Sequence, residues 1–272
     1  MVTPAKSLSA AATQIRRDVV GMCHKAKASH VGSCLSCIEI LTVLYLDKVM
    51  RFDTKKPLWE NRDYFILSKG HASAALYAAL AHAGFFPASR LDSYYQNESS
   101  LPGHPTKGCV PGVEVSTGSL GHGLGLGCGI ATAIKLDGGK NRVFVLLSDG
   151  ELDEGSVWEA VLFSGAKKLD NLVAIVDYNK IQSFGSVEEI LPLEPIEEKF
   201  RAFGWETARL DGNSLEALLG LFSSGFMKSG KPKVVIADTV KGKGVSYMEG
   251  RLEWHYKYPS DAEYAKAMEE LV

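Results

Sequence analysis

Two short apolar runs, at residues 143–147 and 172–176, constrain the fold of this chain more than any other feature. Each run has the length and the continuous apolar character of a strand that is buried on both faces of a parallel sheet. The residues between them, 157–168, have the pattern of a helix. A strand–helix–strand unit of this kind forms a right-handed crossover, which brings the carboxyl ends of both strands to the same edge of the sheet.

Polar residues follow each of these runs, with Asp149 after the first and Asn179 after the second. A carboxylate, a side-chain amide and a nearby backbone carbonyl form an all-oxygen ligand set that is incomplete by itself. Such a set suits Mg²⁺ or Ca²⁺ when a phosphate ligand supplies the remaining oxygens. Asp-Gly is also a common turn, and Asn often caps its own loop. The occurrence of both residues on consecutive strands favours the cofactor site.

The rest of the chain continues the alternation of helix and strand. The sequence predicts helices at 9–28, 33–50, 72–83, 120–136 and 214–222, strands at 64–67, 205–210 and 233–239, and a long irregular loop at 101–118. Strands that alternate with helices predict an α/β fold, a mostly parallel open sheet with helices on both faces. Because no repeat or linker interrupts the pattern, we expect a single domain over residues 1–272.

The composition excludes several classes of protein. A net charge of −2 argues against binding to nucleic acid or to an anionic membrane. Residues 1–12 lack the apolar core of a signal peptide, and no apolar stretch is long enough to span a membrane. Cys34 and Cys37 have C-x-x-C spacing, but no second pair completes a zinc site, so we expect them to pack within a helix. The expected compartment is the cytoplasm.

A glycine-rich run at residues 117–129 has two explanations that the sequence leaves open. It lacks the G-x-G-x-x-G spacing and the preceding strand of a dinucleotide-binding loop. Gly121, Gly125 and Gly129 would share one helical face, where another backbone could approach closely. Alternatively, residues 118–120 present bare backbone at a helix start to a ligand. A second segment, 225–232, resembles a P-loop but has Pro232 in place of the hydroxyl residue, so we reject it.

Four histidines lie beside glycine or at the ends of expected elements, namely His30, His71, His104 and His255. If they converged on one sheet edge, they would supply hydrogen-bond donors and acceptors and transfer protons near neutral pH. A single loop histidine is more commonly a surface residue, and the sequence alone does not show convergence. His24 and His82 lie within helices, where we expect them to pack or to face solvent.

Together these motifs resemble transketolases, in which they occur in the same order. The matching segments are Ala28-Ser29-His30-Val31-Gly32, Ser68-Lys69-Gly70-His71-Ala72, Gly103-His104-Pro105, residues 118–123, Ser148-Asp149-Gly150 through Glu154-Gly155, and Tyr178-Asn179-Lys180. The resemblance covers nearly the whole chain and is to the diphosphate-binding domain of these thiamine-diphosphate enzymes. It implies that Asp149, Asn179 and the Ile181 carbonyl bind a Mg²⁺ or Ca²⁺ that holds the cofactor diphosphate.

The resemblance also implies roles for the remaining motif residues. Those expected against the diphosphate or the thiazolium are His71, Gly150, Asn179 and His255, and those expected near the aminopyrimidine are Gly118, Ser119 and Leu120. Glu154 matches an acid that links the two cofactor sites near a subunit interface. The four histidines match positions that handle the carbonyl and hydroxyls of a sugar. The reaction implied is transfer of a two-carbon ketol unit from a ketose to an aldose, either of which can be a sugar phosphate, with the covalent chemistry supplied by the cofactor.

The chain departs from the family pattern in three ways. Ser148 stands where the family has Gly, and His122 stands where it has Gln. The chain also ends about where a transketolase would continue into its pyrimidine-binding domain. We therefore expect the N-terminal subunit of a split transketolase, which a separate C-terminal subunit completes in a homodimer or an α₂β₂ heterotetramer. The alternatives are a subunit of a 2-oxoacid dehydrogenase and a non-catalytic cofactor-binding or regulatory subunit.

Overall fold

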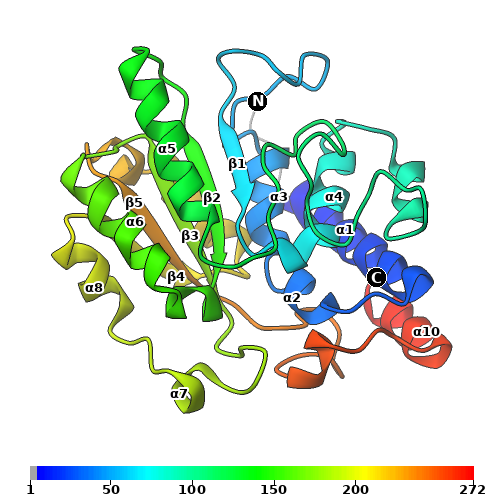
Figure 1. Cartoon of the computed structure of the whole chain (residues 1–272). Coiled ribbons are helices and arrows are strands. Elements are labelled where there is room, and N and C mark those ends of the chain that lie inside the picture. The colour runs from blue at the N-terminus through cyan, green and yellow to red at the C-terminus, as the bar shows by residue number, and fades with distance from the viewer. Residues whose placement is uncertain (1–4) are drawn as a thin grey trace.

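A computed structural model describes residues 5–272, in which one sheet lies between two layers of helices (Figure 1). The five strands are β1 (Tyr64–Leu67), β2 (Val143–Ser148), β3 (Leu172–Tyr178), β4 (Glu206–Asp211) and β5 (Lys233–Asp238). They run parallel in the order β1-β2-β3-β5-β4. Both β2 and β3 are buried along their whole length, which explains their continuous apolar character. The predicted α/β fold is confirmed.

Helices cover both faces of this sheet. They are α1 (Ala5–Ala26), α2 (Val31–Leu35), α3 (Ile38–Leu46), α4 (Ser73–His82), α5 (Gly123–Leu136), α6 (Gly155–Ala166), α7 (Val187–Ile190), α8 (Ile196–Ala202), α9 (Leu215–Ser223) and α10 (Asp261–Glu270). Single 3₁₀ turns occur at Gly70–Ala72, Ala88–Ser93, Gly150–Asp153, Gly225–Lys228 and Leu252–His255. Ser214 and Ser260 cap α9 and α10 by accepting hydrogen bonds from the helix amides, which fixes where these helices begin.

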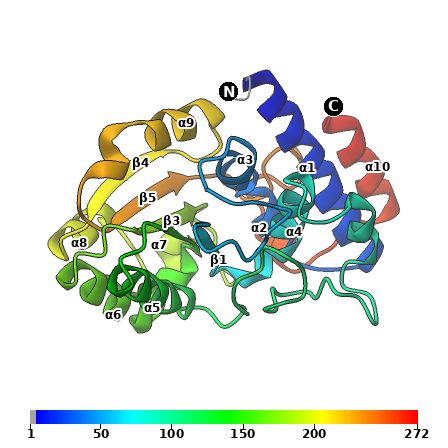
Figure 2. The ribbon, with the colours of Figure 1, turned by 90° about the horizontal axis from the view of Figure 1, so that it is seen from above.

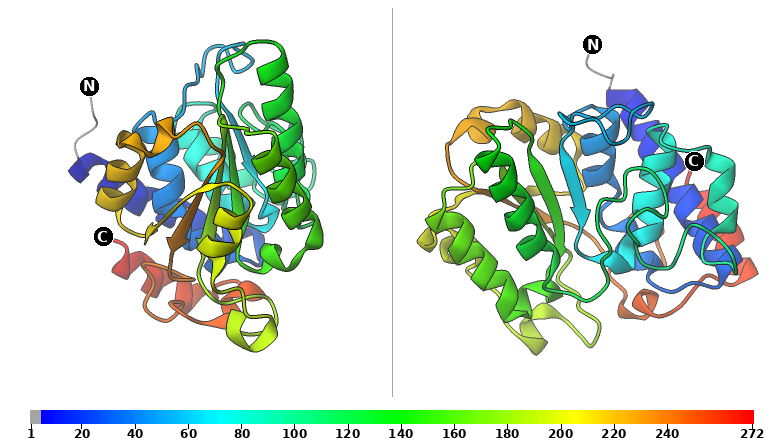
Figure 3. Two further views of the ribbon diagram at one scale, coloured as in Figure 1. Left: turned by 90° about the vertical axis from the view of Figure 1, so that its left-hand side faces the viewer. Right: turned by 45° about the horizontal axis from the view of Figure 1, so that its top comes forward.

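The alternation of side chains along each strand divides the core into two halves. Phe144 and Leu146 of β2 pack with α1, α3, α4 and α9 on one face. Val143, Val145 and Leu147 of the same strand pack with α5, α6 and α8 on the other. The views from above and from the side show these two helical layers on opposite faces of the sheet (Figure 2 and Figure 3). Helix α10 lies outside them, against α1.

The single helix predicted at residues 33–50 is wrong, because the chain forms two helices there, α2 and α3. The break falls at Ser36 and Cys37. The Ser36 hydroxyl donates to Asp177, and its carbonyl accepts from the Asn213 amide at 3.1 Å. These tertiary bonds replace the continued helical ladder. Cys34 therefore lies in α2 while Cys37 precedes α3, and both are buried free thiols.

Helix α5 begins at Gly123, three residues later than predicted. Gly121 lies outside it, in the left-handed region at a φ of 84°, so the predicted common face of Gly121, Gly125 and Gly129 is wrong. The glycine that packs on the sheet is Gly127, where an added Cβ would lie 2.7 Å from Val145 Cγ2. Gly125 and Gly129 instead face open space. The close helix–sheet approach therefore depends on a different glycine from the ones predicted.

The register of the central strands decides where the site lies. Ser148 of β2 pairs with Asp177 of β3, so that Asp149 and Asn179 both emerge at the carboxyl edge of the sheet, as predicted. This edge faces downward in Figure 1, where α2 and α7 also lie. Residues 101–118 form turns and bends, as predicted. Among residues 5–272 no helix combines the length and apolar character needed to cross a membrane.

Candidate functional site

A cavity of about 230 Å³ opens at the carboxyl edge of the sheet. Most of the predicted site residues line it, namely His30, His71, His104, Gly118, Leu120, Asp149, Gly150, Asn179, Ile181 and His255. Ser119 and Glu154 lie outside this lining. Residues from separate stretches of the chain thus meet in one place, which the sequence could only suggest.

Asp149 ties the ends of β2 and β3 together. Its side chain is 2% exposed, and its two oxygens accept hydrogen bonds from the amides of Gly150 at 2.8 Å and Lys180 at 2.6 Å. The Asn179 side-chain oxygen accepts from the Ile181 amide at 3.1 Å. Backbone amides therefore hold the carboxylate and the side-chain amide in place.

The charge of Asp149 makes this position suitable for a cation. Burial raises the pKa of Asp149 to about 6, and the nearby Asp177 acts in the same direction. The two backbone amides that bond Asp149 carry no net charge, so they do not neutralise its buried carboxylate. Among residues 5–272 no three His, Cys, Asp or Glu side chains gather as a metal site. The oxygen set thus fits a hard divalent cation only if a ligand such as a diphosphate supplies further oxygens.

The four predicted histidines converge around His30. Its ring centroid lies 5.4 Å from that of His71, 6.1 Å from that of His104 and 5.0 Å from that of His255. The His30 amide also donates to the His255 carbonyl at 3.0 Å, which fixes the two segments to each other. His30, His71 and His255 are half-buried, so the surface-residue explanation is wrong for them, whereas His104 lines the cavity from an exposed position.

The environment keeps these imidazoles neutral. Burial is the largest cause for all four, and it lowers the pKa of His30 to about 4, that of His255 to about 3, and those of His71 and His104 below their usual range. The ammonium groups of Lys69 and Lys241 lower the pKa of His30, His71 and His255 further. Near pH 7 the cluster therefore offers neutral donors and acceptors, which suits a hydroxylated, uncharged substrate group.

A buried ion pair lies beneath the histidines. Lys69 pairs with Asp177, and both side chains are fully buried. Lys69 Nζ also donates to the Ser33 carbonyl at 2.9 Å, and the hydroxyl of Thr239 donates to Asp177. This network joins segments that each carry a cavity residue within three positions, so it holds the floor of the site rigid.

Lys241 is a site residue that the sequence analysis missed. It is 1% exposed, lines the cavity, and its Nζ lies 3.1 Å from both the Ile181 carbonyl oxygen and His255 Nδ1. Burial lowers its pKa to about 8. Lys241 follows β5 just as Asp149 follows β2, so the same argument from strand ends would have found it. Ser33, Gln182 and Ser183 also line the cavity and were missed.

The two departures from the family pattern lie in different places. Ser148 lines the cavity, and its amide donates to Glu151 at 3.3 Å, while Asp149 keeps its own contacts. His122 is exposed, its Nδ1 lies 3.0 Å from the Leu120 carbonyl oxygen, and it lines a cleft between α5 and α6 instead of the cavity. The His122 side chain is therefore directed toward the outer helical layer.

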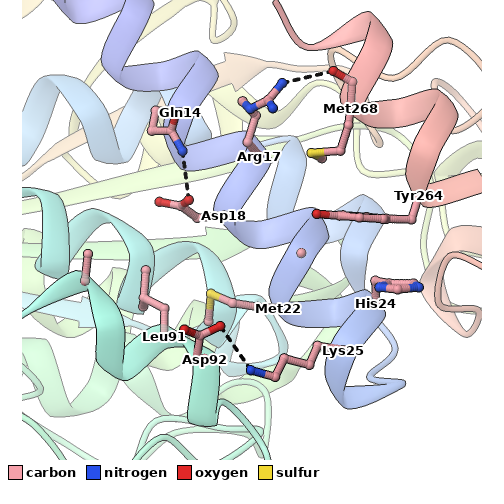
Figure 4. A pocket seen from close by; sticks show the side chains of 12 residues that line it. Gln14, Arg17, Asp18, Met22, His24, Lys25, Leu91, Asp92, Tyr264 and Met268 are labelled. Carbon is pink, nitrogen blue, oxygen red and sulfur yellow. Dashed lines mark hydrogen bonds and ion pairs between the residues drawn. The ribbon is translucent and has the colours of Figure 1, made fainter. Parts of the chain in front are cut away.

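A larger hollow of about 530 Å³ lies between α1, α10 and residues 88–92, away from this edge (Figure 4). Its charged groups have partners within the fold: Lys25 pairs with Asp92 at 3.1 Å, Arg17 donates to the Met268 carbonyl at 2.9 Å, and Asp18 accepts from the Gln14 side chain at 2.9 Å. None of the predicted site residues lines it. The chemistry-bearing residues are thus concentrated in the smaller cavity.

Comparison with known proteins shows the family of the chain. The family described as transketolase, thiamine diphosphate binding domain, matches residues 7–271. A protein of Phocaeicola vulgatus that is named as one of the subunits of apulose-4-phosphate transketolase is 44% identical over 256 residues, which are 94% of this chain and 90% of that protein. The 6-deoxy-6-sulfo-D-fructose transketolase subunit of a Clostridium species is 40% identical over 260 residues, 96% of this chain and 94% of that protein.

Longer transketolases match over only part of their length. Mouse transketolase is 39% identical over 93% of this chain, which is 40% of that protein. The solved transketolase of Campylobacter jejuni superimposes with a TM-score of 0.92 at 32% identity, covering 99% of this chain and 43% of that structure. This chain therefore corresponds to about two fifths of those proteins. The chain belongs to the transketolase family, and its match to the family's thiamine-diphosphate-binding domain extends over residues 7–271.

Proposed function

We propose that this chain is the diphosphate-holding subunit of a split transketolase, a single domain over residues 1–272 that a second chain must complete. The observation that carries the proposal is the cavity in which Asp149 and Asn179 face four neutral imidazoles. The Phocaeicola and Clostridium relatives, of matching length, are named as transketolase subunits, whereas the longer mouse relative is named as a transketolase. The partner would be a C-terminal subunit with the pyrimidine-binding domain.

The cofactor end of the cavity would be built by oxygens and ammonium groups. Asp149, Asn179 and the Ile181 carbonyl would hold Mg²⁺, or Ca²⁺ in its place, and this metal would hold the diphosphate. Lys241 would face the diphosphate charge, because its buried ammonium already lies at the same carbonyl. Gly118, Leu120 and Gly150 line the cavity, and the backbone of residues 118–120 would border the cofactor.

The histidines would handle the sugar. Bound thiamine diphosphate supplies the nucleophilic carbon that adds to a ketose carbonyl. His30, His71, His104 and His255 would orient the carbonyl and hydroxyls through hydrogen bonds, which neutral imidazoles both donate and accept at pH 7. The relatives are named for apulose 4-phosphate and 6-deoxy-6-sulfo-D-fructose, so an anionic, phosphorylated or modified ketose is the substrate class that we propose.

The assembly that we propose is a homodimer of this chain, or an α₂β₂ heterotetramer with the partner. The cleft between α5 and α6, of about 780 Å³, exposes Leu126 and Phe163 beside the open Gly125 and Gly129. Glu154 lies next to this cleft, against Gly121. An exposed apolar surface of this kind is typical of an interface. Five unpaired cysteines suit a reducing compartment, so we propose the cytoplasm.

The proposal is tested by reconstitution. The chain, its candidate partner and their mixture are assayed with thiamine diphosphate and Mg²⁺ for ketol transfer from a ketose phosphate. We expect turnover only in the mixture, and a loss of about a hundredfold or more for His71→Ala and His104→Ala, because each removes a group that acts on the substrate. Robust ketol transfer by this chain alone would contradict the split-site proposal.

The same assay separates the alternative functions. A 2-oxoacid dehydrogenase subunit would support turnover of a 2-oxo acid and not of a ketose phosphate. A non-catalytic subunit would give His71→Ala and His104→Ala mixtures with unchanged turnover. His24→Ala serves as a matched control, because it removes an imidazole of α1 that does not line the cavity.

A further inference from the structure

Glu151 is a fully buried carboxylate to which the sequence and the proposed mechanism assign no role. It lies in the 3₁₀ turn after β2, two residues beyond Asp149. Its Oε1 accepts hydrogen bonds from the Ser68 hydroxyl and from the Gly121 amide at 2.9 Å. Its Oε2 accepts from the Ser148 amide at 3.3 Å. One side chain therefore satisfies three donors from three distant parts of the chain.

Each of these donors belongs to a segment that lines the cavity. Ser68 lies three residues before His71, and Ser148 immediately precedes Asp149. Gly121 immediately follows residues 118–120 of the glycine run, two of which line the cavity. Glu151 does not line the cavity itself, so it acts on these segments from behind.

Two of these segments, around Ser68 and in the glycine run, are packed too tightly to shift independently. A Cβ on Gly70 would lie 2.7 Å from the Gly118 amide nitrogen, and a Cβ on Gly123 would lie 2.9 Å from Ser68 Cα. Backbone atoms of residues 68–70 therefore pack directly against backbone atoms of residues 118–123. Under such packing, the hydrogen bonds of Glu151 fix the position of residues 118–120 relative to His71 and Asp149.

We propose that Glu151 is a positioning residue that holds the glycine run against the two cofactor-binding strand ends, so that its loss weakens thiamine diphosphate binding without removing a contact to the cofactor. This inference rests on the proposed function, since it concerns the same site.

The variant Glu151→Gln separates this role from simple space filling. It keeps the size of the side chain but replaces one accepting oxygen with an NH₂ group. The backbone N–H groups of Gly121 and Ser148 bond different oxygens of Glu151. The side-chain NH₂ group of glutamine must therefore face one of these two donors. One buried N–H is then left without an acceptor. Ser68→Ala is the milder variant, because it removes one donor and leaves both backbone amides bonded.

The matched control is Asp63→Asn. Asp63 is also a buried carboxylate, 2% exposed, and it bonds Arg51 and Arg142 at the opposite, amino-terminal end of β1. Its loss should lower stability without touching the cavity. Comparing Asp63→Asn with Glu151→Gln therefore distinguishes a general loss of stability from a displacement of the glycine run.

Two measurements on the reconstituted mixture of this chain and its partner test the inference. Hydrogen exchange should become about tenfold faster at residues 117–123 in Glu151→Gln, while exchange in β3 stays as in the wild type. Calorimetric titration with thiamine diphosphate and MgCl₂ should show an affinity about tenfold weaker, the effect expected when one buried donor is left unsatisfied. Ser68→Ala should change both in the same direction by a smaller factor, and Asp63→Asn should change neither.

Each other outcome has a definite meaning. Unchanged exchange at residues 117–123 in both Glu151→Gln and Ser68→Ala overturns the inference. Faster exchange with unchanged affinity also overturns it, because Glu151 would then be only structural. If the wild-type mixture of this chain and its partner does not bind thiamine diphosphate, the proposed function fails and the inference falls with it, whereas normal wild-type binding with an unaffected Glu151→Gln mixture rejects the inference alone.

Discussion

The four imidazoles at the cavity illustrate how burial sets chemistry at the scale of single residues. His30 lies in the left-handed region at a φ of 72°, which brings its ring among those of His71, His104 and His255. The same burial that lowers its pKa also makes the folded state a weaker proton acceptor than the unfolded chain. The fold that keeps the cluster neutral at pH 7 therefore loses stability in acid.

The variant His30→Asn tests this link. Because the pKa of His30 falls from 6.5 to about 4 on folding, the unfolded chain binds the proton first, and stability is lost as the pH falls from about 6.5 to about 4. After allowance for solvent screening, the loss due to His30 is roughly 2 kcal/mol. We expect His30→Asn, which tolerates the left-handed conformation, to lose less stability than the wild type over this window. Denaturant unfolding at a series of pH values measures it.

The exposed His122→Asn is the control for this series. Its side chain lies outside the buried cluster, so its pH dependence should parallel that of the wild type. If His30→Asn and the wild type lose stability equally between about pH 6.5 and about pH 4, His30 is not held neutral by folding.

At the scale of elements, the glycines of helix α5 lie on two different sides of the helix. Gly127 lies against β2, where a side chain would collide with Val145. Gly125 and Gly129 lie on the outer side of the same helix, in open space. A glycine in a helix costs about 1 kcal/mol relative to alanine. Close packing on the sheet offsets this cost at Gly127. At Gly125 and Gly129, no contact within residues 5–272 offsets it.

A pair of glycine-to-alanine variants measures this difference. Gly127→Ala should destabilise the chain by about 1–2 kcal/mol, because overpacking against the buried Val145 exceeds the gain in helix propensity. Gly220→Ala, within α9, meets no atom within 4 Å and should stabilise by up to about 1 kcal/mol. Urea unfolding of both variants gives the two changes in free energy, and equal signs would contradict this account of α5.

At the scale of the whole molecule, the exposed apolar residues of the outer layer are the feature that the fold itself leaves unexplained. Leu126 of α5 is 43% exposed and Phe163 of α6 is 42% exposed, and both line the cleft between these helices. The cavity opens at the carboxyl edge of the sheet, so the cleft and the cavity are separate surfaces. A homodimer contact at the cleft would leave the cavity for the partner subunit.

Two variants of α5 test the homodimer. Leu126→Asp places a charge in the cleft and should convert a dimer into a monomer, halving the molar mass measured by light scattering. Leu136→Asp is the control, because Leu136 is 82% exposed on the same helix but lies outside the cleft lining, and it should leave the mass unchanged. A monomeric wild type in the presence of the partner would reject the proposed assembly.

Local sequence patterns predict most of the helices and strands. The range of β1 was predicted to the residue, and the ends of β2 and β3 were predicted closely, because buried parallel strands are continuous apolar runs with polar residues at their ends. The errors fall where tertiary contacts override local preference. Ser36 breaks a helix by bonding Asp177 and Asn213, and Gly121 lies before α5 because its amide bonds Glu151. None of these three partners can be read from neighbouring residues.

The sequence by itself determined the parallel α/β fold, the sheet edge at which Asp149 and Asn179 meet, and the family to which the chain belongs. Each of these follows from periodicity, strand ends or motif order, which are local properties of the chain. Only the tertiary structure decided that the four histidines converge, that Lys241 joins them, and that Glu151 fastens three segments behind the cavity. Those facts depend on strand order and on contacts between residues far apart in sequence, so burial and charge at the site arise only once the chain has folded.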